Sequence, residues 1–133
     1  MPQAKSQSRK IYIVDDDDSV RKALSRLLRA EGFDFESFSS GEAFLATLAD
    51  DARGCVVMDI RMPGLTGYDI QEKLRARGHK IPVIALSAQD GEDDRARAHA
   101  LGATAFFRKP VDDQALLDAI TWAVRDAAIR CKS

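Results

Sequence analysis

Carboxylate, hydroxyl and amine side chains follow short apolar runs at four places in this sequence. Asp15 and Asp16 come directly after Ile-Tyr-Ile-Val, and Asp59 comes directly after Cys-Val-Val-Met. Ser87 follows Val-Ile-Ala-Leu, and Lys109 follows Ala-Phe-Phe-Arg. Such runs are typical of strands buried in a parallel sheet, whose carboxyl ends meet at one edge and bind ligands there. We therefore expect these side chains to converge.

The chemistry that suits this set of residues is phosphoryl transfer onto a carboxylate, with Asp59 as the nucleophile. Two carboxylates about 4 Å apart repel each other by roughly 4 kcal/mol at an effective dielectric constant near 20, so Asp15 and Asp16 are expected to hold a cation. An oxygen-rich set without nearby His or Cys suits Mg2+ better than zinc. The ammonium of Lys109 and the hydroxyl of Ser87 would bind phosphoryl oxygens. Each residue alone could simply cap a helix or end a turn, and their joint occurrence favours a site.

The elements between these residues alternate between strands and helices. Apolar residues recur at helical spacing after each apolar run, and glycines close several of these helices. The alternation predicts an α/β fold, a (βα)5 doubly wound five-stranded parallel sheet with helices on both faces, as in flavodoxin-like three-layer sandwiches. The helix predicted over 90–101 places mainly alanines inward, Ala96 and Ala100 beside Leu101, so we expect it to be weakly anchored. The strands are predicted at 11–14, 33–38, 55–59, 81–86 and 104–108.

Length and composition predict one cytoplasmic domain. The chain has 133 residues and a formal net charge of -1, so no polybasic segment points to nucleic acid or a membrane surface. No apolar stretch is long enough to span a membrane, and no signal peptide is evident. Cys55 and Cys131 do not form a disulfide framework, which favours a reduced compartment. We expect a flexible polar leader at 1–9, the domain at 10–128 and a polar tail at 129–133.

The chemistry-bearing segments resemble those of a known family, the response-regulator receiver domains of bacterial two-component signalling. The resemblance covers Lys10 to about Val124 and implies a CheY-like fold. It also implies that Asp59 accepts a phosphoryl group from a sensor histidine kinase or a histidine phosphotransfer protein. The chain would then be a signalling domain that assists its own phosphorylation and dephosphorylation. The matching segments are Val14-Asp15-Asp16, the phosphorylation segment Val57–Gly64, Ala85-Leu86-Ser87-Ala88 and Phe107-Arg108-Lys109-Pro110.

The same resemblance assigns a metal site. It implies that Mg2+, or Mn2+ in its place, is bound by Asp16, Asp59 and the backbone carbonyl of Arg61, with Asp15 assisting. It further implies a cis peptide bond between Lys109 and Pro110, an isomer that X-Pro bonds adopt at modest cost.

Other positions would control the switch and the lifetime of the phosphoryl group. Phe106 lies where the family carries its switch aromatic, often Tyr, and would turn inward as Ser87 moves toward the phosphoryl group. Arg61 and Gln89, two residues beyond Asp59 and Ser87, would flank the path of the hydrolytic water and tune dephosphorylation.

The last predicted helix carries a second apolar stripe. Its core stripe runs through Leu116, Ile120, Val124 and Ala127, whereas Ala115, Trp122 and Ile129 are spaced by seven on the opposite side. Scattered surface residues are the simpler interpretation. The alternative is a contact surface, because an exposed Trp is a frequent interface anchor. On that interpretation, phosphorylation would promote a homodimer or partner binding through the face of the fourth helix, the fifth strand and the fifth helix.

Several alternatives to a phosphorylated receiver fit the sequence less well. Phosphatases of the haloacid-dehalogenase class need a second Asp two residues after the nucleophile, where this chain has Arg61. A flavodoxin-like cofactor site would place a phosphate against the acids of 15–18, which would repel it. Degenerate receivers usually lack an acid or the Lys, and this chain keeps them.

The output of the chain stays open from the sequence. The local sequence from Asp15 to Arg21 looks most like that of receivers of the FixJ group, which normally precede a helix-turn-helix domain. Because the chain stops at Ser133, it would act as a stand-alone phosphate relay or sink, or as the receiver piece of a DNA-binding regulator. No direct binding of nucleic acid by this chain is expected.

Overall fold

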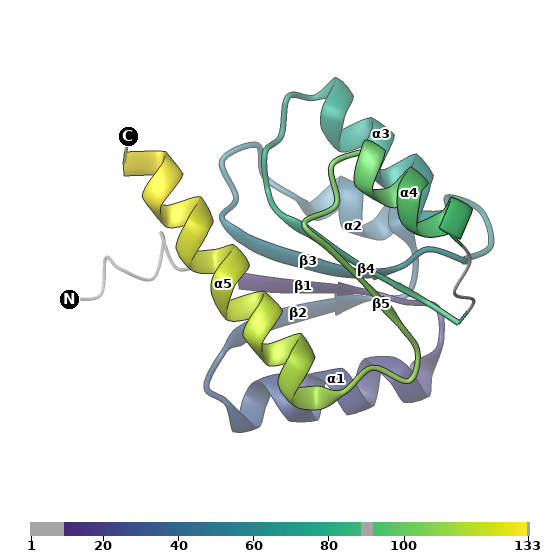
Figure 1. Ribbon diagram of the computed structural model, residues 1–133, viewed down its shortest axis with the longest axis vertical. Coiled ribbons are helices and arrows are strands. Elements are labelled where there is room, and N and C mark those ends of the chain that lie inside the picture. The colour runs from purple at the N-terminus through teal and green to yellow at the C-terminus, as the bar shows by residue number, and fades with distance from the viewer. Residues whose placement is uncertain (1–9, 89–91, 133) are drawn as a thin grey trace.

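Five short apolar segments form the sheet at the centre of this computed structural model, which describes residues 10–88 and 92–132. All paired strands are parallel and follow the order β2-β1-β3-β4-β5, so the predicted doubly wound sheet is confirmed (Figure 1). The central β3 is buried along its whole length, as its continuous apolar run predicts. The strands are β1 (Lys10–Val14), β2 (Asp34–Phe38), β3 (Gly54–Asp59), β4 (Val83–Ser87) and β5 (Ala105–Arg108).

Three of the helices begin after a polar residue whose side chain caps the first turn. Asp17, Ser40 and Thr66 each accept a hydrogen bond from a backbone N–H in the first turn of the helix that follows. These bonds satisfy N–H groups that have no partner within the helix. The helices are α1 (Asp18–Ala30), α2 (Gly41–Thr47), α3 (Gly67–Ala76), α4 (Glu92–Ala100) and α5 (Asp113–Lys132).

Each face of the sheet is covered by its own helices. Alternation along β1 sends Ile11 and Ile13 toward α1 and α5, and sends Tyr12 and Val14 toward α2 and α3. Figure 1 shows α1 and α5 on one side of the sheet and α2, α3 and α4 on the other. The sheet is thus the middle layer of three, and its carboxyl edge stays open for a site.

The inward face of α4 differs from the sequence prediction. Ala96 and Ala100 are exposed, Leu101 is partly buried, and Ala98 is the buried alanine. The prediction of Ala96 and Ala100 as core residues was therefore wrong. Alanines alternate with charged residues along this helix, so their small side chains do not define one face. Of the α4 side chains that the structure describes, Ala98 alone is buried.

The structure describes part of the chain near the two predicted ends of the domain. The predicted leader at 1–9 lies outside the described residues, whereas α5 continues to Lys132, past residue 128. In the described ranges, no helix combines the length and the apolar composition that a membrane crossing requires.

Two helix-starting glycines provide a test of packing next to β3. A Cβ on Gly67 would lie 2.8 Å from Ile60 Cα and 3.0 Å from the carbonyl oxygen of Asp59, whereas a Cβ on Gly41 would lie 2.7 Å from Ile70 Cδ1. A side-chain methyl can rotate away, but backbone atoms of β3 and its following loop cannot. We expect Gly67→Ala to lower the free energy of unfolding by about 1–3 kcal/mol, and Gly41→Ala to lower it less. Urea denaturation measures the free energy of unfolding of both variants. Equal losses would contradict the closer packing of backbone atoms around Gly67.

Candidate functional site

The register of the sheet places four of the five predicted residues at the carboxyl ends of adjacent strands. Val14 is the partner of Met58, so Asp15 and Asp59 come next to each other one residue later. Ser87 ends β4 and is paired with Arg108, which directly precedes Lys109. The carboxyl edge therefore brings together residues from β1, β3, β4 and the end of β5, as the sequence predicted.

Three carboxylates gather at this edge, and we call them the acidic site. Oxygen atoms of Asp15, Asp16 and Asp59 all lie within 4.8 Å of one another. Asp15 and Asp59 are 1% and 6% exposed, whereas Asp16 is exposed. Carboxylate oxygens that converge from a buried and an open side fit a hard cation that keeps some of its water, as Mg2+ does.

Lys109 supplies the positive charge next to these acids. Its Nζ lies 2.8 Å from Asp15 Oδ2 and 3.4 Å from Asp59 Oδ2. Burial lowers the pKa of Lys109, but the ion pairs with Asp15 and then Asp59 outweigh it, so the pKa of Lys109 is raised. The predicted cis peptide bond between Lys109 and Pro110 is present, and Lys109 N–H donates to the carbonyl of Ser87.

The carboxylate of Asp59 is poorly hydrated. Burial raises the pKa of Asp59, and the nearby Asp15 raises it further, while Lys109 and the backbone N–H of Arg61 act in the opposite direction. That N–H donates to Asp59 Oδ1 at 3.1 Å. An incoming phosphoryl group would thus meet a carboxylate with little water to displace and a fixed ammonium at its side.

The remaining acids of the first turn serve structure. Asp17 caps α1 by accepting from Ser19 N–H, and Asp18 forms ion pairs with Arg21 and Lys22. The neighbouring Asp15 accepts from the backbone N–H of Asp17 at 2.9 Å. The four consecutive acids therefore divide between a helix start and the acidic site.

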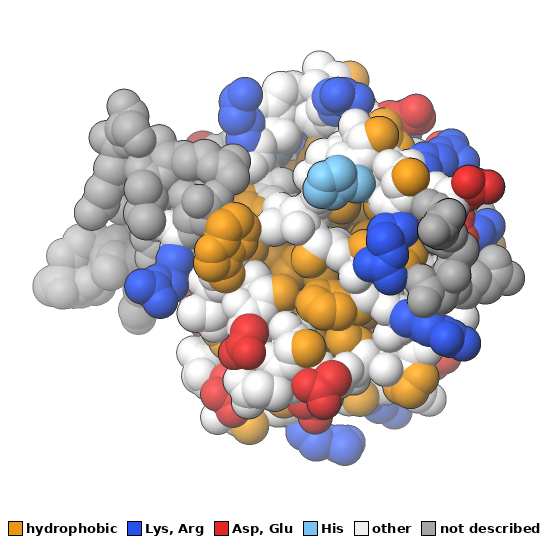
Figure 2. Space-filling model, viewed as in Figure 1, with side chains coloured by type: hydrophobic (Ala, Val, Ile, Leu, Met, Phe, Trp, Pro, Cys, Tyr) orange, Lys and Arg blue, Asp and Glu red, His pale blue; other side chains and the backbone are white. Residues whose placement is uncertain are grey.

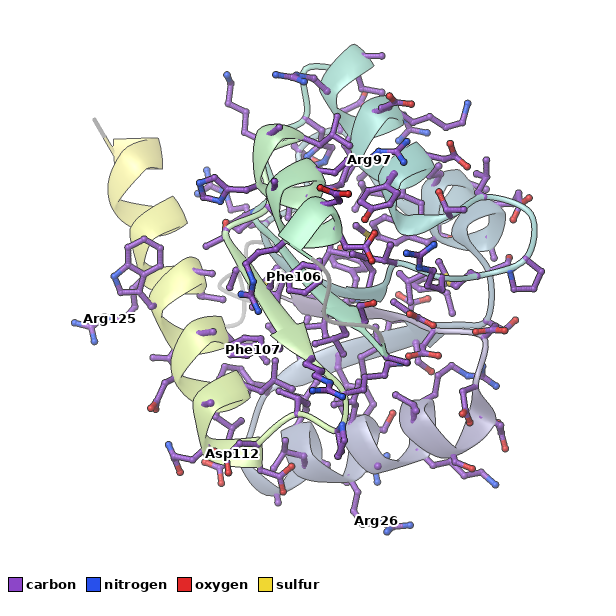
Figure 3. The ribbon with its side chains drawn as sticks, turned by 45° about the vertical axis from the view of Figure 1, so that its right-hand side comes forward. Arg26, Arg97, Phe106, Phe107, Asp112 and Arg125 are labelled. Carbon is purple, nitrogen blue, oxygen red and sulfur yellow. The ribbon has the colours of Figure 1, made fainter. Side chains whose placement is uncertain are left out.

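The two predicted switch residues lie on neighbouring strands. Ser87 is fully buried at the end of β4. Phe106 on β5 is partly buried and contacts α4, because the guanidinium of Arg95 lies 4.9 Å from its ring centroid. Figure 3 shows Phe106 on β5, close to the start of α4.

The side chain of Arg61 has a partner that the sequence did not suggest. Its Nη2 donates to both carboxylate oxygens of Asp94, at 2.9 and 2.7 Å, and Tyr68 Oη donates to Asp94 Oδ1 at 2.7 Å. Asp94 lies 33 residues from Arg61, and no spacing rule links the two. Gln89, the other residue predicted to tune dephosphorylation, lies outside the described residues.

The predicted contact surface is described in part. Trp122 is 58% exposed, Ala115 is partly buried, and the side chain of Ile129 lies outside the described residues. Figure 2 shows hydrophobic side chains gathered over β5, between α4 and α5. A hollow of 510 Å³ at this face is lined by residues such as Ala103, Ala105 and Phe106.

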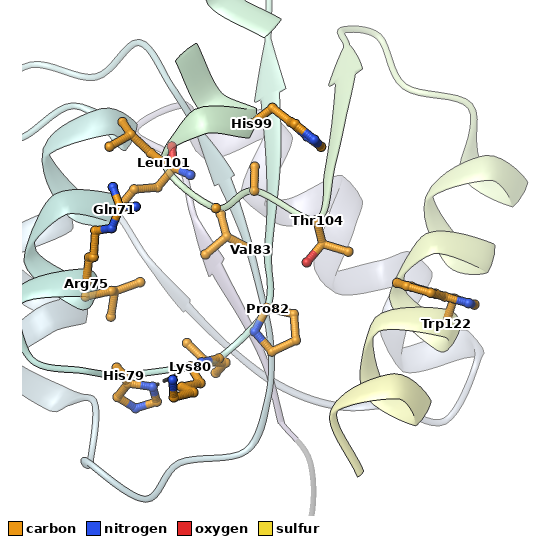
Figure 4. A pocket seen from close by; sticks show the side chains of 14 residues that line it. Gln71, Arg75, His79, Lys80, Pro82, Val83, His99, Leu101, Thr104 and Trp122 are labelled. Carbon is orange, nitrogen blue, oxygen red and sulfur yellow. Dashed lines mark hydrogen bonds between the residues drawn. The ribbon is translucent and has the colours of Figure 1, made fainter. Parts of the chain in front are cut away.

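A further groove, of 540 Å³, lies far from the acidic site. It follows the amino ends of the strands, where Pro82 precedes β4 and Thr104 precedes β5, and Trp122 forms one wall (Figure 4). Because the acidic site lies at the opposite, carboxyl edge, this groove takes no part in its chemistry.

Comparison with known proteins links this arrangement to one family. The family model of the response regulator receiver domain matches residues 11–121. Response regulator protein TmoT of Ectopseudomonas mendocina is 43% identical over 115 residues, which are 86% of this chain and 52% of TmoT. The transcriptional regulatory protein FixJ of Azorhizobium caulinodans is 37% identical over 114 residues, which are 86% of this chain and 54% of FixJ. The chain spans about half the length of these curated relatives.

Two solved structures superpose closely on this chain. The response regulator StyR superposes with a TM-score of 0.89 at 39% identity, over 94% of this chain and 63% of the StyR chain. The crystal structure of FixJ-N superposes with a TM-score of 0.83 at 34% identity, over 90% of this chain and 95% of that chain.

Because the pKa of Asp59 is raised, we predict that replacing Asp59 increases the stability of the fold by an amount that depends on pH. Because the folded chain binds this proton more readily than the unfolded chain, stability falls as the pH rises from the usual carboxyl value of 3.8 through the raised value. Asp59→Asn should therefore raise the free energy of unfolding at pH 7, and the gain should shrink as the pH falls toward about 4. Lys109 keeps its pairing with Asp15 in this variant.

Urea denaturation at a series of pH values, in buffer containing EDTA, measures this difference. Asp50→Asn is the control, because Asp50 is exposed and loses the same charge. A variant at Asp59 that is no more stable than wild type at pH 7 would contradict the assigned cost of burying this carboxylate.

Proposed function

The chain belongs to the response regulator receiver domain family, and from that premise we propose that it accepts a phosphoryl group on Asp59 and changes the surface of α4, β5 and α5 in response. The observation that carries the proposal is the position of Lys109 Nζ, 2.8 Å from Asp15 and 3.4 Å from Asp59, beside three converging carboxylates. A nucleophile, a cation-binding set and a fixed positive charge are the parts that phosphoryl transfer onto a carboxylate needs.

The transfer step uses Asp59 as the attacking group. A carboxylate oxygen attacks the phosphorus of a phosphohistidine, the P–N bond breaks, and the histidine nitrogen leaves with the electron pair and takes up a proton. The product is an acyl phosphate on Asp59. Lys109 holds one phosphoryl oxygen, and the hydroxyl of Ser87 donates to another. Hydrolysis of the acyl phosphate by water restores Asp59.

Receiver domains bind Mg2+ at an acidic pocket, and the acidic site of this chain fits that ion. Asp16, Asp59 and the backbone carbonyl of Arg61 would hold it, with Asp15 assisting, and Mn2+ would suit the same oxygens. The bound ion reduces the repulsion between the carboxylate and the anionic phosphoryl group.

The partner that supplies the phosphoryl group is a sensor histidine kinase or a histidine phosphotransfer protein in the cytoplasm. After phosphorylation, Ser87 moves toward the phosphoryl group and Phe106 turns inward, which shifts an existing equilibrium of the α4–β5–α5 face. The exposed Trp122, with Ala115 and Ile129 on the same helix, anchors a homodimer or another partner there.

The lifetime of the phosphoryl group depends on residues beside the path of the hydrolytic water. We assign this role to Arg61 and Gln89, which lie two residues beyond Asp59 and Ser87. The chain thereby assists its own phosphorylation and dephosphorylation without acting on another substrate.

Replacing the nucleophile tests the central proposal. Wild type incubated with acetyl phosphate and Mg2+ should gain the mass of one phosphoryl group, and Asp59→Asn should gain none, because an amide oxygen is too weak a nucleophile. Intact-protein mass spectrometry measures the gain. Asp17→Asn is a matched control, since Asp17 caps α1 and should leave acceptance unchanged. Single phosphorylation that persists in Asp59→Asn would refute the assignment.

Replacing the exposed carboxylate tests the metal site. Asp16→Ala should weaken Mg2+ binding by at least about tenfold, because second-shell changes alone can cost that much and a ligand is lost here. Its fold should persist, since like charges are relieved. Calorimetric titration with Mg2+ provides the affinity, with Asp17→Ala as the comparison one residue later. Unchanged affinity in Asp16→Ala would exclude Asp16 as a ligand.

A further inference from the structure

Arg61 contacts the acidic site with its backbone and a different helix with its side chain. Its N–H donates to Asp59 Oδ1 at 3.1 Å, and its guanidinium binds both oxygens of Asp94 on α4, the shorter contact being 2.7 Å. One residue therefore connects the loop after β3 to the first turns of α4.

Asp94 is held from a second side by α3. Tyr68, which is 5% exposed, donates its hydroxyl to Asp94 Oδ1 at 2.7 Å. The hydrogen bond from Tyr68 and then that from Arg61 lower the pKa of Asp94, and burial together with the bond to Asp94 raises the pKa of Tyr68 to about 12. The guanidinium of Arg97 lies 4.1 Å from the centroid of the Tyr68 ring, between α4 and α3 as Figure 3 shows. We call Arg61, Tyr68 and Asp94 the anchor cluster.

The anchor cluster is more than a surface ion pair. The side chain of Arg61 is 52% exposed, and an isolated pair at such a position contributes little because water screens it. The side chain of Asp94 is only 16% exposed, however, and it accepts from a buried hydroxyl as well as from a guanidinium. Hydrogen bonds that share a charged acceptor out of water are stronger and restrict its geometry.

The anchor cluster also supplies polar contacts to a helix that buries little apolar surface. Within the described part of α4, Ala98 is the one buried side chain, so apolar burial holds this helix weakly. The polar contacts of Asp94 with the loop after β3 and with α3 therefore help to position the helix, together with the hydrogen bond from Gln71 Nε2 on α3 to the carbonyl of Ala98 at 3.0 Å.

We propose that Asp94 and Tyr68 are positioning residues for the acidic site, which hold the side chain of Arg61 and thereby orient its backbone N–H toward Asp59 and its backbone carbonyl toward Mg2+. The proposal rests on the function proposed above and adds α4 to the residues that determine metal affinity. Removing the anchor leaves the Arg61 backbone free to adopt other orientations, so Mg2+ binding must then order it.

The coupling has a reciprocal consequence. If contacts between α4 and Arg61 raise the affinity for Mg2+, then Mg2+ stabilises the position of α4 by the same factor. Backbone amides of α4 should therefore exchange more slowly with deuterium when Mg2+ is present, and this protection should be smaller in variants without the anchor.

The test is calorimetric titration of the full chain with Mg2+ alone. Asp94→Asn and Tyr68→Phe should each weaken binding by about three- to tenfold, the size expected for coupled neighbours. Asp93→Asn removes the same charge from an exposed position next to Asp94 and should have a smaller effect. Tyr68→Phe changes no charge and keeps the ring, so any loss in that variant comes from the hydroxyl.

Arg61→Ala separates positioning from simple electrostatics by the sign of its effect. Removing a positive charge near a cation site would strengthen Mg2+ binding if charge alone mattered, whereas the proposal expects weaker binding. Arg61→Lys keeps the charge but lacks the guanidinium Nη2 that contacts both oxygens of Asp94, and it should also bind Mg2+ more weakly than wild type. Circular dichroism before each titration establishes that the variant is folded. If another variant is unfolded, Tyr68→Phe alone tests the proposal.

The outcomes distinguish this inference from the proposed function. If wild type binds no Mg2+ and takes no phosphoryl group, the proposed function fails and the inference fails with it. If wild type binds Mg2+ while Asp94→Asn equals Asp93→Asn and Tyr68→Phe equals wild type, only the positioning role is overturned. Weaker Mg2+ binding in the anchor variants, together with smaller Mg2+-dependent protection of α4, supports the positioning role.

Discussion

The close approach of carboxylates at one edge of a parallel sheet is the constraint on which the rest of this structure depends. Asp15 and Asp59 are nearly buried, and their negative charges would be costly without the ammonium of Lys109 beside them. Asp15, Asp59 and Lys109 lie at the carboxyl ends of β1, β3 and β5, so only a correctly paired sheet provides this compensation. The site can therefore form only in the folded chain. The combined charge of its carboxylates and Lys109 still allows a metal ion and an anionic ligand to bind.

The two parts of the protein differ in how firmly they are held. Strands β1 and β3, which position the acids at their carboxyl ends, are packed on both faces by apolar side chains, and this rigidity suits a site that must present fixed charges. Helix α4 has little apolar surface to bury and is held by polar contacts, those from Asp94 to Arg61 and Tyr68 and that from Gln71 to the carbonyl of Ala98. A rigid acidic site beside a weakly packed helix is the arrangement that a two-state switch needs, because a modest local change can then move the helix.

Much of the fold and the acidic site follows from local features of the sequence. A continuous apolar run that ends in Asp59 predicts both a buried strand and the position of its carboxylate, because a strand places its last residue at the edge of the sheet. The same holds for Asp15, Ser87 and Lys109, and the register confirms that these positions are neighbours. Resemblance to receiver domains supplied the roles, which apolar pattern alone does not provide.

Only the tertiary structure decided which of two adjacent acids is buried with Lys109, which alanine of α4 faces inward, and where the side chain of Arg61 points. Asp15 and Asp16 are the same residue type, and their different exposure follows from how β1 turns into α1 beside β3. Alternating alanines specify no face, so the packing of α4 on its neighbours selected Ala98. The partner of Arg61 comes from a segment far along the chain. The sequence thus determined what is local or set by strand pattern, and contacts between distant side chains required the folded chain, because their geometry depends on every element that packs between them.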